Sequence, residues 1–302
     1  MYDTIIIGAG ISGLTAALYA ERKKMNFKIL ATQIGGQFMV SGEVLNYPGI
    51  IKTTGVEFLK IMEDQMKFNN VKVDNETVKE IKKVGTNFKI ITDKGKYDSK
   101  SIIMATGSKP RMLNVPGEGE FAKKGVTYCS ICDGPLFAGK DVAVIGGGDS
   151  ALEAVDFLKD IVNKIYMIVR GDKFKGHQYL IDRVTKNKKV ECIFEANTSQ
   201  IVGDKFVTGL KYEKDGKETE IKLQGVIIEA GRLPNTELVK DFVKLDPDGH
   251  IMIDCQTHSS VPGLFAAGDC GDGHEYQYVI AAGQGSMALI KAARYLSHKE
   301  DK

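Results

Sequence analysis

Two glycine-rich fingerprints of the same kind constrain the fold of this chain more than any other feature. The first reads Gly8-Ala-Gly10-Ile-Ser-Gly13, and the second reads Gly146-Gly-Gly148-Asp-Ser-Ala151. Each follows a short apolar run and precedes a helical pattern with another apolar run behind it. Because this order of strand, turn, helix and strand is the context that a dinucleotide fingerprint requires, we expect βαβ units at 2–30 and 141–169.

The length of 302 residues suits two domains. The sequence changes character near Val115-Pro116-Gly117-Glu118 and again after Gly231. A strand that leads into Gly268-Asp269 and a final helix over 279–296 then complete the first domain from the far end of the chain. We therefore predict an α/β fold with two Rossmann-like, three-layer nucleotide-binding domains, the second (117–244) inserted in the first (1–116 and 245–302).

Each glycine of the first fingerprint has a separate physical task. Gly8 permits a tight turn, Gly10 lets a pyrophosphate approach the backbone, and Gly13 lets the helix pack on the strand. The pattern therefore predicts that a dinucleotide binds at the start of this helix. No acid follows the second strand, where Ala31 and Thr32 stand, so the usual ribose contact is not expected.

The second fingerprint favours a nicotinamide dinucleotide. After its second strand stands Arg170 instead of an acid, which suits the 2′-phosphate of NADPH, and Lys175 adds positive charge. Asp172 would repel that phosphate, so NADH and a site that has lost its nicotinamide role stay open as alternatives. The residues expected to form the turn are Gly146, Gly148, Ser150 and Ala151.

A cysteine pair, Cys129-Ser-Ile-Cys132, lies between the two fingerprints and is followed by Asp133. Two intervening residues bring the thiols close enough to form a redox-active disulfide. Asp133 is a candidate proton donor to the leaving thiolate, with an ordinary turn or helix-capping role as the alternative. A pair of buried structural thiols and half of a zinc site are the competing interpretations. Two nucleotide sites and one dithiol together indicate a disulfide reductase.

Composition excludes several other classes. The 41 basic and 39 acidic residues leave a net charge of +2, which argues against a nucleic-acid-binding protein. No apolar run reaches the roughly 18 residues of a membrane span, and no signal peptide precedes the first strand, so we expect a cytoplasmic protein. The five histidines are scattered and the three other cysteines lack zinc-site spacing, so no metal site is expected.

The motifs resemble those of the low-molecular-weight thioredoxin reductases. The Cys-x-x-Cys-Asp sequence just before the second fingerprint is specific, whereas glutathione-reductase-type enzymes carry their pair in the first domain. The stretches that match run nearly the full chain in family order: Gly8 to Gly13, Gly35 to Gln37, Asn46 to Gly49, Ala105 to Gly107, Cys129 to Gly134, Gly146 to Ala151, Pro234-Asn235, Ala267 to Asp269, Gln277 and Ala281 to Gly283.

This resemblance implies FAD in the first domain and an NAD(P)H-binding-like second domain that carries the dithiol. It also implies thioredoxin or a thioredoxin-like protein as the partner, a homodimer, a rotation of the domains about the crossings near 116 and 245, and Cys132 as the cysteine that meets the flavin. The residues implied to bind FAD are Gly8, Gly10, Ser12, Gly13, Gly36, Gln37, Asn46, Thr106, Gly107, Gly268, Asp269 and Gln277.

One departure from the family leaves the electron donor open. NADPH-using members carry His-Arg-Arg-x-x-x-Arg after the second strand of the second domain, whereas Val169-Arg170-Gly171 and Lys175 stand here. The ferredoxin-dependent flavin thioredoxin reductases lack a working nicotinamide site, so ferredoxin is the alternative donor.

Three further functions compete with thioredoxin reduction. A flavoprotein that reduces a peroxiredoxin is one alternative, although such proteins carry an additional N-terminal dithiol domain. A ferredoxin–NADP reductase would lack Cys129 and Cys132. A redox sensor that signals through the disulfide is the non-enzymatic alternative.

Overall fold

The computed structural model describes residues 1–300, with side chains up to residue 297. The chain forms two compact units, Met1–Lys109 with Leu233–Lys302, and Pro110–Arg232. We call them unit 1 and unit 2. The chain passes between them twice, through β9 (Ser108–Pro110) and β18 (Arg232–Pro234), and these two short strands pair with each other.

Unit 1 is built on a seven-stranded mixed sheet with the order β5-β2-β1-β8-β7-β6 and with β19 also paired to β8. The pairs between β1, β2, β5, β8 and β19 are parallel, whereas β6, β7 and β8 form an antiparallel meander. The elements of unit 1 are β1 (Tyr2–Ala9), α1 (Ile11–Arg22), β2 (Phe27–Ile34), η1 (Gly36–Val40), β3 (Glu43–Val44), β4 (Thr53–Thr54), α2 (Gly55–Phe68), β5 (Val73–Asn75), β6 (Val78–Val84), β7 (Asn87–Thr92), β8 (Lys96–Met104), β19 (Leu264–Ala266) and α6 (Tyr278–Glu300).

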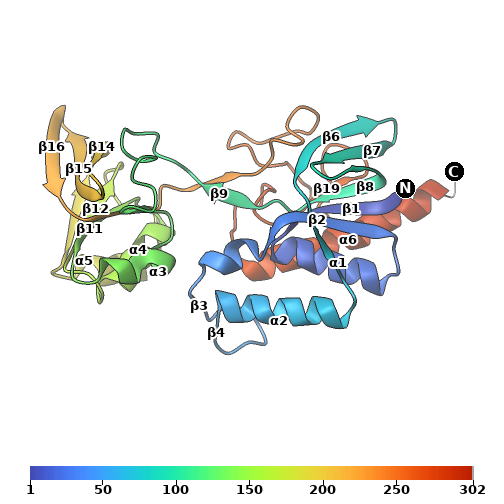
Figure 1. Ribbon diagram of the computed structural model, residues 1–302, viewed down its shortest axis with the longest axis horizontal. Helices are drawn as coiled ribbons and strands as arrows, with labels where there is room; N and C mark the ends of the chain where they lie inside the picture. The colour runs from blue at the N-terminus through green and yellow to red at the C-terminus, as the bar shows by residue number, and fades with distance from the viewer. Residues whose placement is uncertain (301–302) are drawn as a thin grey trace. The chain divides into compact units, whose positions relative to one another are not determined.

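Apolar residues on both faces of the sheet in unit 1 explain its layers. Ile6 of β1 points into a core shared with α1, α2 and α6, while Ile5 and Ile7 point into a second core with β6 and β7. Figure 1 shows the three helices on one side of the sheet. A strand buried on both faces needs a continuous apolar run, which is why β1 reads Thr-Ile-Ile-Ile.

Unit 2 repeats this plan around a five-stranded parallel sheet with the order β10-β17-β11-β12-β13. Its elements are β10 (Val126–Thr127), α3 (Ser130–Asp133), η2 (Gly134–Phe137), β11 (Asp141–Ile145), α4 (Asp149–Leu158), β12 (Lys164–Val169), α5 (Gln178–Thr185), β13 (Val190–Phe194), β14 (Asn197–Gly203), β15 (Val207–Lys214), β16 (Lys217–Lys222) and β17 (Gly225–Ile228).

The parallel sheet of unit 2 lies between two layers. Val142 and Val144 of β11 pack with α4 and α5, whereas Ala143 and Ile145 pack toward the antiparallel sheet β14-β15-β16. The predicted α/β fold with two dinucleotide-binding domains is therefore confirmed. The helix of the second fingerprint, α4, begins at Asp149, within the fingerprint itself.

The crossings between the units differ from the expected positions after 116 and 244. Leu113 and Val115 pack on the core of unit 2, and the buried Glu118 carboxylate accepts the backbone N–H groups of Leu113 and Asn114. On the return, Val239 and Val243 join the second core of unit 1. The apolar residues that flank the Gly and Pro turns therefore move the crossings to 109–110 and 232–233.

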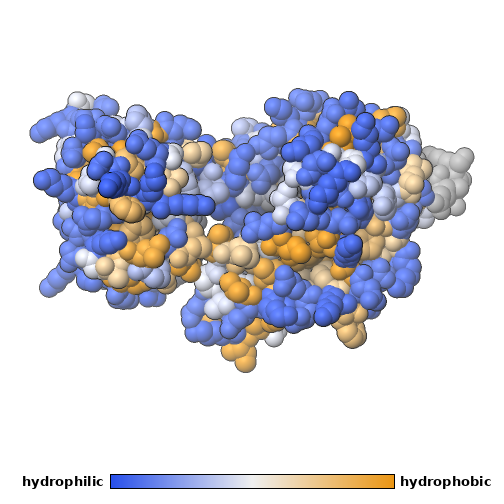
Figure 2. All heavy atoms as spheres, viewed as in Figure 1, coloured by the Kyte–Doolittle hydropathy of each residue, from blue (hydrophilic) through white to orange (hydrophobic). Residues whose placement is uncertain are grey.

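Polar residues cover much of the visible face of each unit, with apolar residues between them (Figure 2). Among the residues that the structure describes, no helix has both the length and the apolar character needed to cross a membrane.

Candidate active site

The first fingerprint forms the tight turn between β1 and α1. Gly8 has φ of 108°, and a Cβ at this position would lie 2.2 Å from the carbonyl oxygen of Ala105 at the end of β8. A Cβ on Gly13 would lie 1.9 Å from the Gly8 oxygen, so helix and strand approach too closely for a side chain. Around Gly10, a Cβ would meet nothing within 4 Å. The turn is therefore closed toward the protein and open at Gly10, as backbone contact with a phosphate requires.

The start of α1 is suited to an anion. Gly10 precedes the helix without a side-chain cap, and the first turn of α1 contains no acidic residue. The first backbone N–H groups of the helix are thus left without side-chain acceptors, and the helix dipole adds positive potential at the same point. Gly36 packs on this turn, because its Cβ would lie 3.2 Å from the Gly10 Cα.

The other residues implied to bind FAD gather at the carboxyl ends of the strands β2, β8 and β19 or in the loops that follow. Gly268 fits closely against Ser12, since a Cβ there would lie 2.9 Å from the Ser12 Oγ. The Asn46 side-chain amide donates to Gln277 Oε1 at 2.9 Å. Sites at the carboxyl ends of parallel strands are where ligands bind in such sheets.

Several residues that hold this region were not identified from the sequence. Ser108 Oγ donates to Asp269 Oδ2 at 3.0 Å, and the Gly268 N–H donates to Gln284 Oε1 at 2.8 Å. Asn235 joins the loop after β8, because its side chain donates to the Thr106 carbonyl and its own carbonyl accepts the Thr106 hydroxyl. The Pro234-Asn235 motif was visible, but its contact with Thr106 depends on chain positions far apart.

These observations fit FAD in unit 1. An uncapped helix start, an open approach at Gly10 and polar side chains such as Asp269 at the adjacent strand ends form a site of the required chemistry. No acid follows β2, as expected, but the strand ends later than expected. The strand continues through Ala31 and Thr32 to Ile34, and Gly35 follows it.

The second fingerprint has the same backbone geometry. Gly146 has φ of 143°, and its Cβ would lie 2.2 Å from the carbonyl oxygen of Glu229, at the end of β17. The Ala151 methyl group would lie 3.0 Å from that Cβ, and Gly148 is open in the way that Gly10 is. Ser150 is exposed in the first turn of α4. The turn is thus formed, and its backbone geometry is compatible with a dinucleotide.

The side chains around this second turn differ from those of the first. Asp149 stands in the first turn of α4, and its Oδ1 accepts the His177 backbone N–H at 2.7 Å. The Lys175 backbone N–H donates to the Gly147 carbonyl at 2.7 Å, while the Arg170 and Lys175 side chains are exposed. The pKa of Glu229 is raised to about 7, because burial and, to a smaller extent, the nearby Glu153 outweigh the opposing effect of Arg232. Acidic groups therefore accompany the two expected basic residues.

Cys129 and Cys132 form a disulfide with a Cα–Cα distance of 5.4 Å. Cys129 precedes the short helix α3, and its Sγ accepts the Cys132 backbone N–H at 3.1 Å. Cys132 is exposed at the surface of unit 2, and Cys129 is half-buried. Close behind the pair, a Cβ on Gly134 would lie 2.9 Å from Leu158 of α4. The disulfide is therefore fixed to the helix that follows the second fingerprint and stays accessible.

Asp133 is half-buried and accepts a short hydrogen bond from the Thr127 hydroxyl. The same hydroxyl oxygen accepts the Cys129 backbone N–H at 3.1 Å. Thr127 thus connects the acid to the cysteine pair, and it was not identified from the sequence. Asp133 is the last residue of α3, and Thr127 holds its carboxyl close to the backbone of Cys129.

The remaining cysteines have no comparable arrangement. Burial raises the pKa values of Cys192 and Cys270, which lowers the reactivity of both thiols. Cys255 is exposed and separate from the pair.

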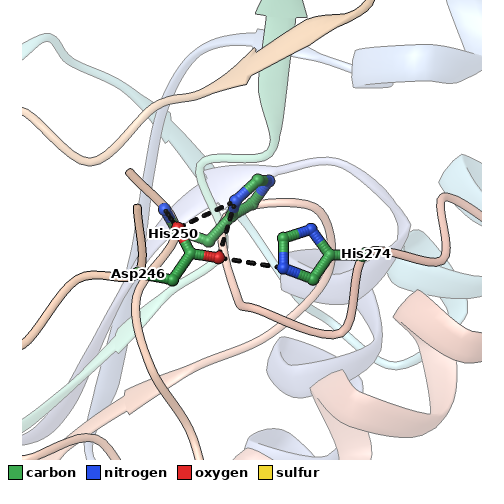
Figure 3. A group of neighbouring side chains, drawn as sticks. All are labelled: Asp246, His250 and His274. Carbon is green, nitrogen blue, oxygen red and sulfur yellow. Dashed lines mark hydrogen bonds and ion pairs between the residues drawn. The ribbon is translucent and has the colours of Figure 1, made fainter. Parts of the chain in front are cut away.

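Two of the five histidines depart from the expected scatter. His250 and His274 meet around Asp246 in unit 1, on loops 24 residues apart in the sequence (Figure 3). Spacing along the chain could not predict this group, because it depends on how the two loops fold onto each other. His298 lies outside the side chains that the structure describes.

Comparison with known families agrees with this geometry. The family model of pyridine nucleotide-disulphide oxidoreductases matches residues 2–294. The chain belongs to this family. The family implies flavin binding, and the predicted resemblance to thioredoxin reductases is confirmed at the level of the family and its solved structures.

Three similar proteins show the range within the family. A crystal structure of Lactococcus lactis thioredoxin reductase has a TM-score of 0.92 and 34% identity, and covers 99% of this chain and 100% of that one. A Staphylococcus aureus (strain MSSA476) subunit of alkyl hydroperoxide reductase is 38% identical over 98% of this chain, which spans only 59% of that relative. A ferredoxin-flavin thioredoxin reductase of Clostridium acetobutylicum is 27% identical with a TM-score of 0.56, and each chain is covered to 98%.

Proposed function

We propose that this chain is a flavin-dependent reductase of the disulfide in a thioredoxin-like protein. The observation that carries the proposal is the Cys129–Cys132 disulfide, which is accessible and fixed to the helix of the second fingerprint in a member of this family. The similar solved structures that are named thioredoxin reductases support the choice of partner.

Bound FAD would supply a two-electron reservoir in unit 1. Reduction of the Cys129–Cys132 disulfide takes up two electrons and two protons and gives a dithiol. A thiolate of the pair then attacks the substrate disulfide and forms a mixed disulfide. The second cysteine attacks its partner's sulfur, the Cys129–Cys132 bond re-forms, and the substrate leaves as a dithiol. The net reaction moves two electrons from the electron donor, by way of the flavin and the cysteine pair, to the substrate disulfide, which takes up two protons.

We assign the attack on the substrate to Cys129. The Cys132 backbone N–H that points at its Sγ would stabilise a thiolate there, and hydrogen bonding to the charged form lowers a thiol pKa. This leaves Cys132 as the sulfur that exchanges electrons with the flavin, as the family resemblance implies. Asp133, held by Thr127, would give a proton to the departing thiolate.

We propose NADPH as the electron donor, bound at the second fingerprint with Arg170 and Lys175 near the 2′-phosphate. The intact turn from Gly146 to Ala151 supports this choice, and the exposed Arg170 side chain is available for a phosphate. Asp149 and Glu229 weigh against it, and reduced ferredoxin is the alternative donor.

A second candidate function follows from the similarity to the alkyl hydroperoxide reductase protein of Staphylococcus aureus. In this alternative, the electrons of the Cys129–Cys132 dithiol go to a peroxiredoxin. The two functions are separated by coupled assays in which thioredoxin or a peroxiredoxin is the only electron acceptor. We also predict a homodimer, which light scattering would test by measuring the molar mass in solution.

The donor is tested by anaerobic bleaching of the FAD-loaded protein with NADPH, NADH or reduced ferredoxin. Rapid bleaching by NADPH alone supports the proposed donor. Bleaching by ferredoxin and by neither nucleotide would assign the chain to the ferredoxin-dependent branch and leave the disulfide chemistry intact.

A further inference from the structure

Two turns of the same design occur close together in unit 1. In each, an aspartate stands four residues before a histidine: Asp246 before His250, and Asp254 before His258. In the first turn, Asp246 Oδ1 accepts the backbone N–H groups of Asp248 and His250 at 2.9 and 2.8 Å. The second turn repeats these bonds at Asp254 Oδ1 with nearly equal lengths. Both turns therefore hold a carboxylate beside an imidazole.

The turns differ in the surroundings of the second carboxylate oxygen, Oδ2. Asp246 Oδ2 lies 3.2 Å from His250 Nδ1 and 2.9 Å from His274 Nε2, so a third side chain joins the first turn. Asp246 Oδ2 is fully buried, and among the described residues it receives no hydrogen bond of acceptable geometry. A buried carboxylate oxygen that faces two ring nitrogens without a well-aligned donor suits a cation between them.

We propose that Asp246, His250 and His274 form a binding site for a divalent transition-metal ion of the zinc class. One ligand atom from each residue lies within 4.8 Å of the others, and Figure 3 shows the carboxylate oxygen directed at both rings. Bond lengths of about 2.0–2.2 Å around tetrahedral zinc place neighbouring ligand atoms roughly 3.3 Å apart, close to the 3.2 and 2.9 Å observed here. Small side-chain movements suffice to admit the ion.

The surroundings of His250 set it up as a ligand. Its side chain is 3% exposed, and its Nε2 lies 2.9 Å from the Tyr276 hydroxyl. In the tautomer whose Nε2 proton is donated to this hydroxyl, the Nδ1 lone pair faces Asp246 and is free to bind a metal ion. The backbone N–H groups of Asp248 and His250 hold the Asp246 carboxylate in place.

The donor set decides the class of ion. Two imidazole nitrogens and one carboxylate oxygen suit zinc and its transition-metal neighbours, whereas magnesium and calcium take mainly oxygen ligands. His274 is about half exposed, so one coordination position would face solvent and hold water. The proposed site lies wholly in unit 1 and is independent of the proposed reductase function.

The test is isothermal titration calorimetry of ZnCl₂ into the FAD-loaded, chelator-treated protein without an affinity tag. The disulfide is kept oxidised, and all samples carry Cys255→Ser, because an exposed thiol also binds zinc. His274→Asn is the main variant, since its side chain is exposed and asparagine tolerates the left-handed conformation at this position (φ 55°). His258→Asn is the matched control, because its turn has the same design without a third ligand among the described residues.

We expect one zinc ion per chain, a rise in melting temperature with zinc, and no saturable binding of MgCl₂. His274→Asn should weaken zinc binding by roughly 100-fold. Loss of a residue that only supports a ligand costs about 10- to 100-fold, and loss of a ligand should cost at least as much. His258→Asn should leave binding unchanged. The proposal is overturned if the unsubstituted protein binds no zinc, or if His274→Asn binds it as tightly as His258→Asn does.

Discussion

The two fingerprints form backbone turns of the same geometry but differ in the side chains around them. In unit 1, Gly8 passes over the carbonyl of Ala105, and in unit 2, Gly146 passes over that of Glu229. The first helix begins without an acid, whereas Asp149 lies in the first turn of the second. The backbone turn therefore explains why both units are of the dinucleotide-binding type. The charges around each turn decide how strongly an anion is held there.

We propose that flavin binds in unit 1 and that the disulfide chemistry takes place in unit 2. Cys132→Ser should break the link between them and give the largest effect. We expect flavin content and flavin reduction to persist, while turnover with thioredoxin falls by at least about 1,000-fold, as for loss of a covalent participant. Coupled NADPH or ferredoxin oxidation measures the turnover. Cys255→Ser is the control, and retained turnover of Cys132→Ser would contradict the dithiol mechanism.

The last position of the fingerprint is Gly13 in unit 1 and Ala151 in unit 2, so exchanging glycine and alanine there gives two opposite variants. Gly13→Ala places a methyl group 1.9 Å from the Gly8 oxygen, so the turn must open. We expect a loss of about 3 kcal/mol in unfolding free energy, and loss of FAD. Ala151→Gly removes a methyl group from α4 and should cost about 1 kcal/mol. Urea unfolding and flavin absorbance measure both, and equal costs would contradict the difference in packing between the turns.

The acidic surroundings of the second turn predict a pH dependence. Burial raises the pKa of Glu229 from 4.5 to about 7, so the folded chain binds a proton there that the unfolded chain has lost. The unfolding free energy therefore falls as pH rises through this window. After allowance for partial exposure, Glu229→Gln should gain up to about 2 kcal/mol at pH 8 and little at pH 4. Urea unfolding at both pH values measures this. Exposed Glu220→Gln is the control, and a gain of equal size at both pH values would argue against the shift.

The smallest effect concerns the donor. If Arg170 contacts the 2′-phosphate, Arg170→Gln should raise the KM for NADPH about fivefold and leave that for NADH unchanged, because one exposed ion pair is lost. Steady-state kinetics with both nucleotides measure the ratio. Lys173→Gln, an exposed neighbour, is the control. An unchanged NADPH preference would remove Arg170 from the site.

Local patterns predicted much of this fold. The β1–α1–β2 unit follows from its apolar runs and the glycine turn between them. The cysteine pair and both turns were predicted for the same reason, since each lies within a few consecutive residues. Boundaries were less accurate, because residues such as Leu113 and Val239 are assigned to a unit by the core they join.

Contacts between distant segments could not be predicted. The bond from Ser108 to Asp269 and the link between Asn235 and Thr106 join strand ends that only the folded sheet brings together. The group of Asp246, His250 and His274 arises in the same way. The electron donor depends on the balance of Arg170 and Lys175 against Asp149 and Glu229, which geometry alone does not determine.

The most direct test of the central claim is an anaerobic dithionite titration of the FAD-loaded protein, which requires no choice of natural donor. Full reduction of the unsubstituted chain should consume two electron equivalents more than that of Cys132→Ser, because the Cys129–Cys132 disulfide is a two-electron couple in exchange with the flavin. Equal consumption by both proteins would show that the disulfide does not communicate with the flavin, and the proposed reductase mechanism would be wrong.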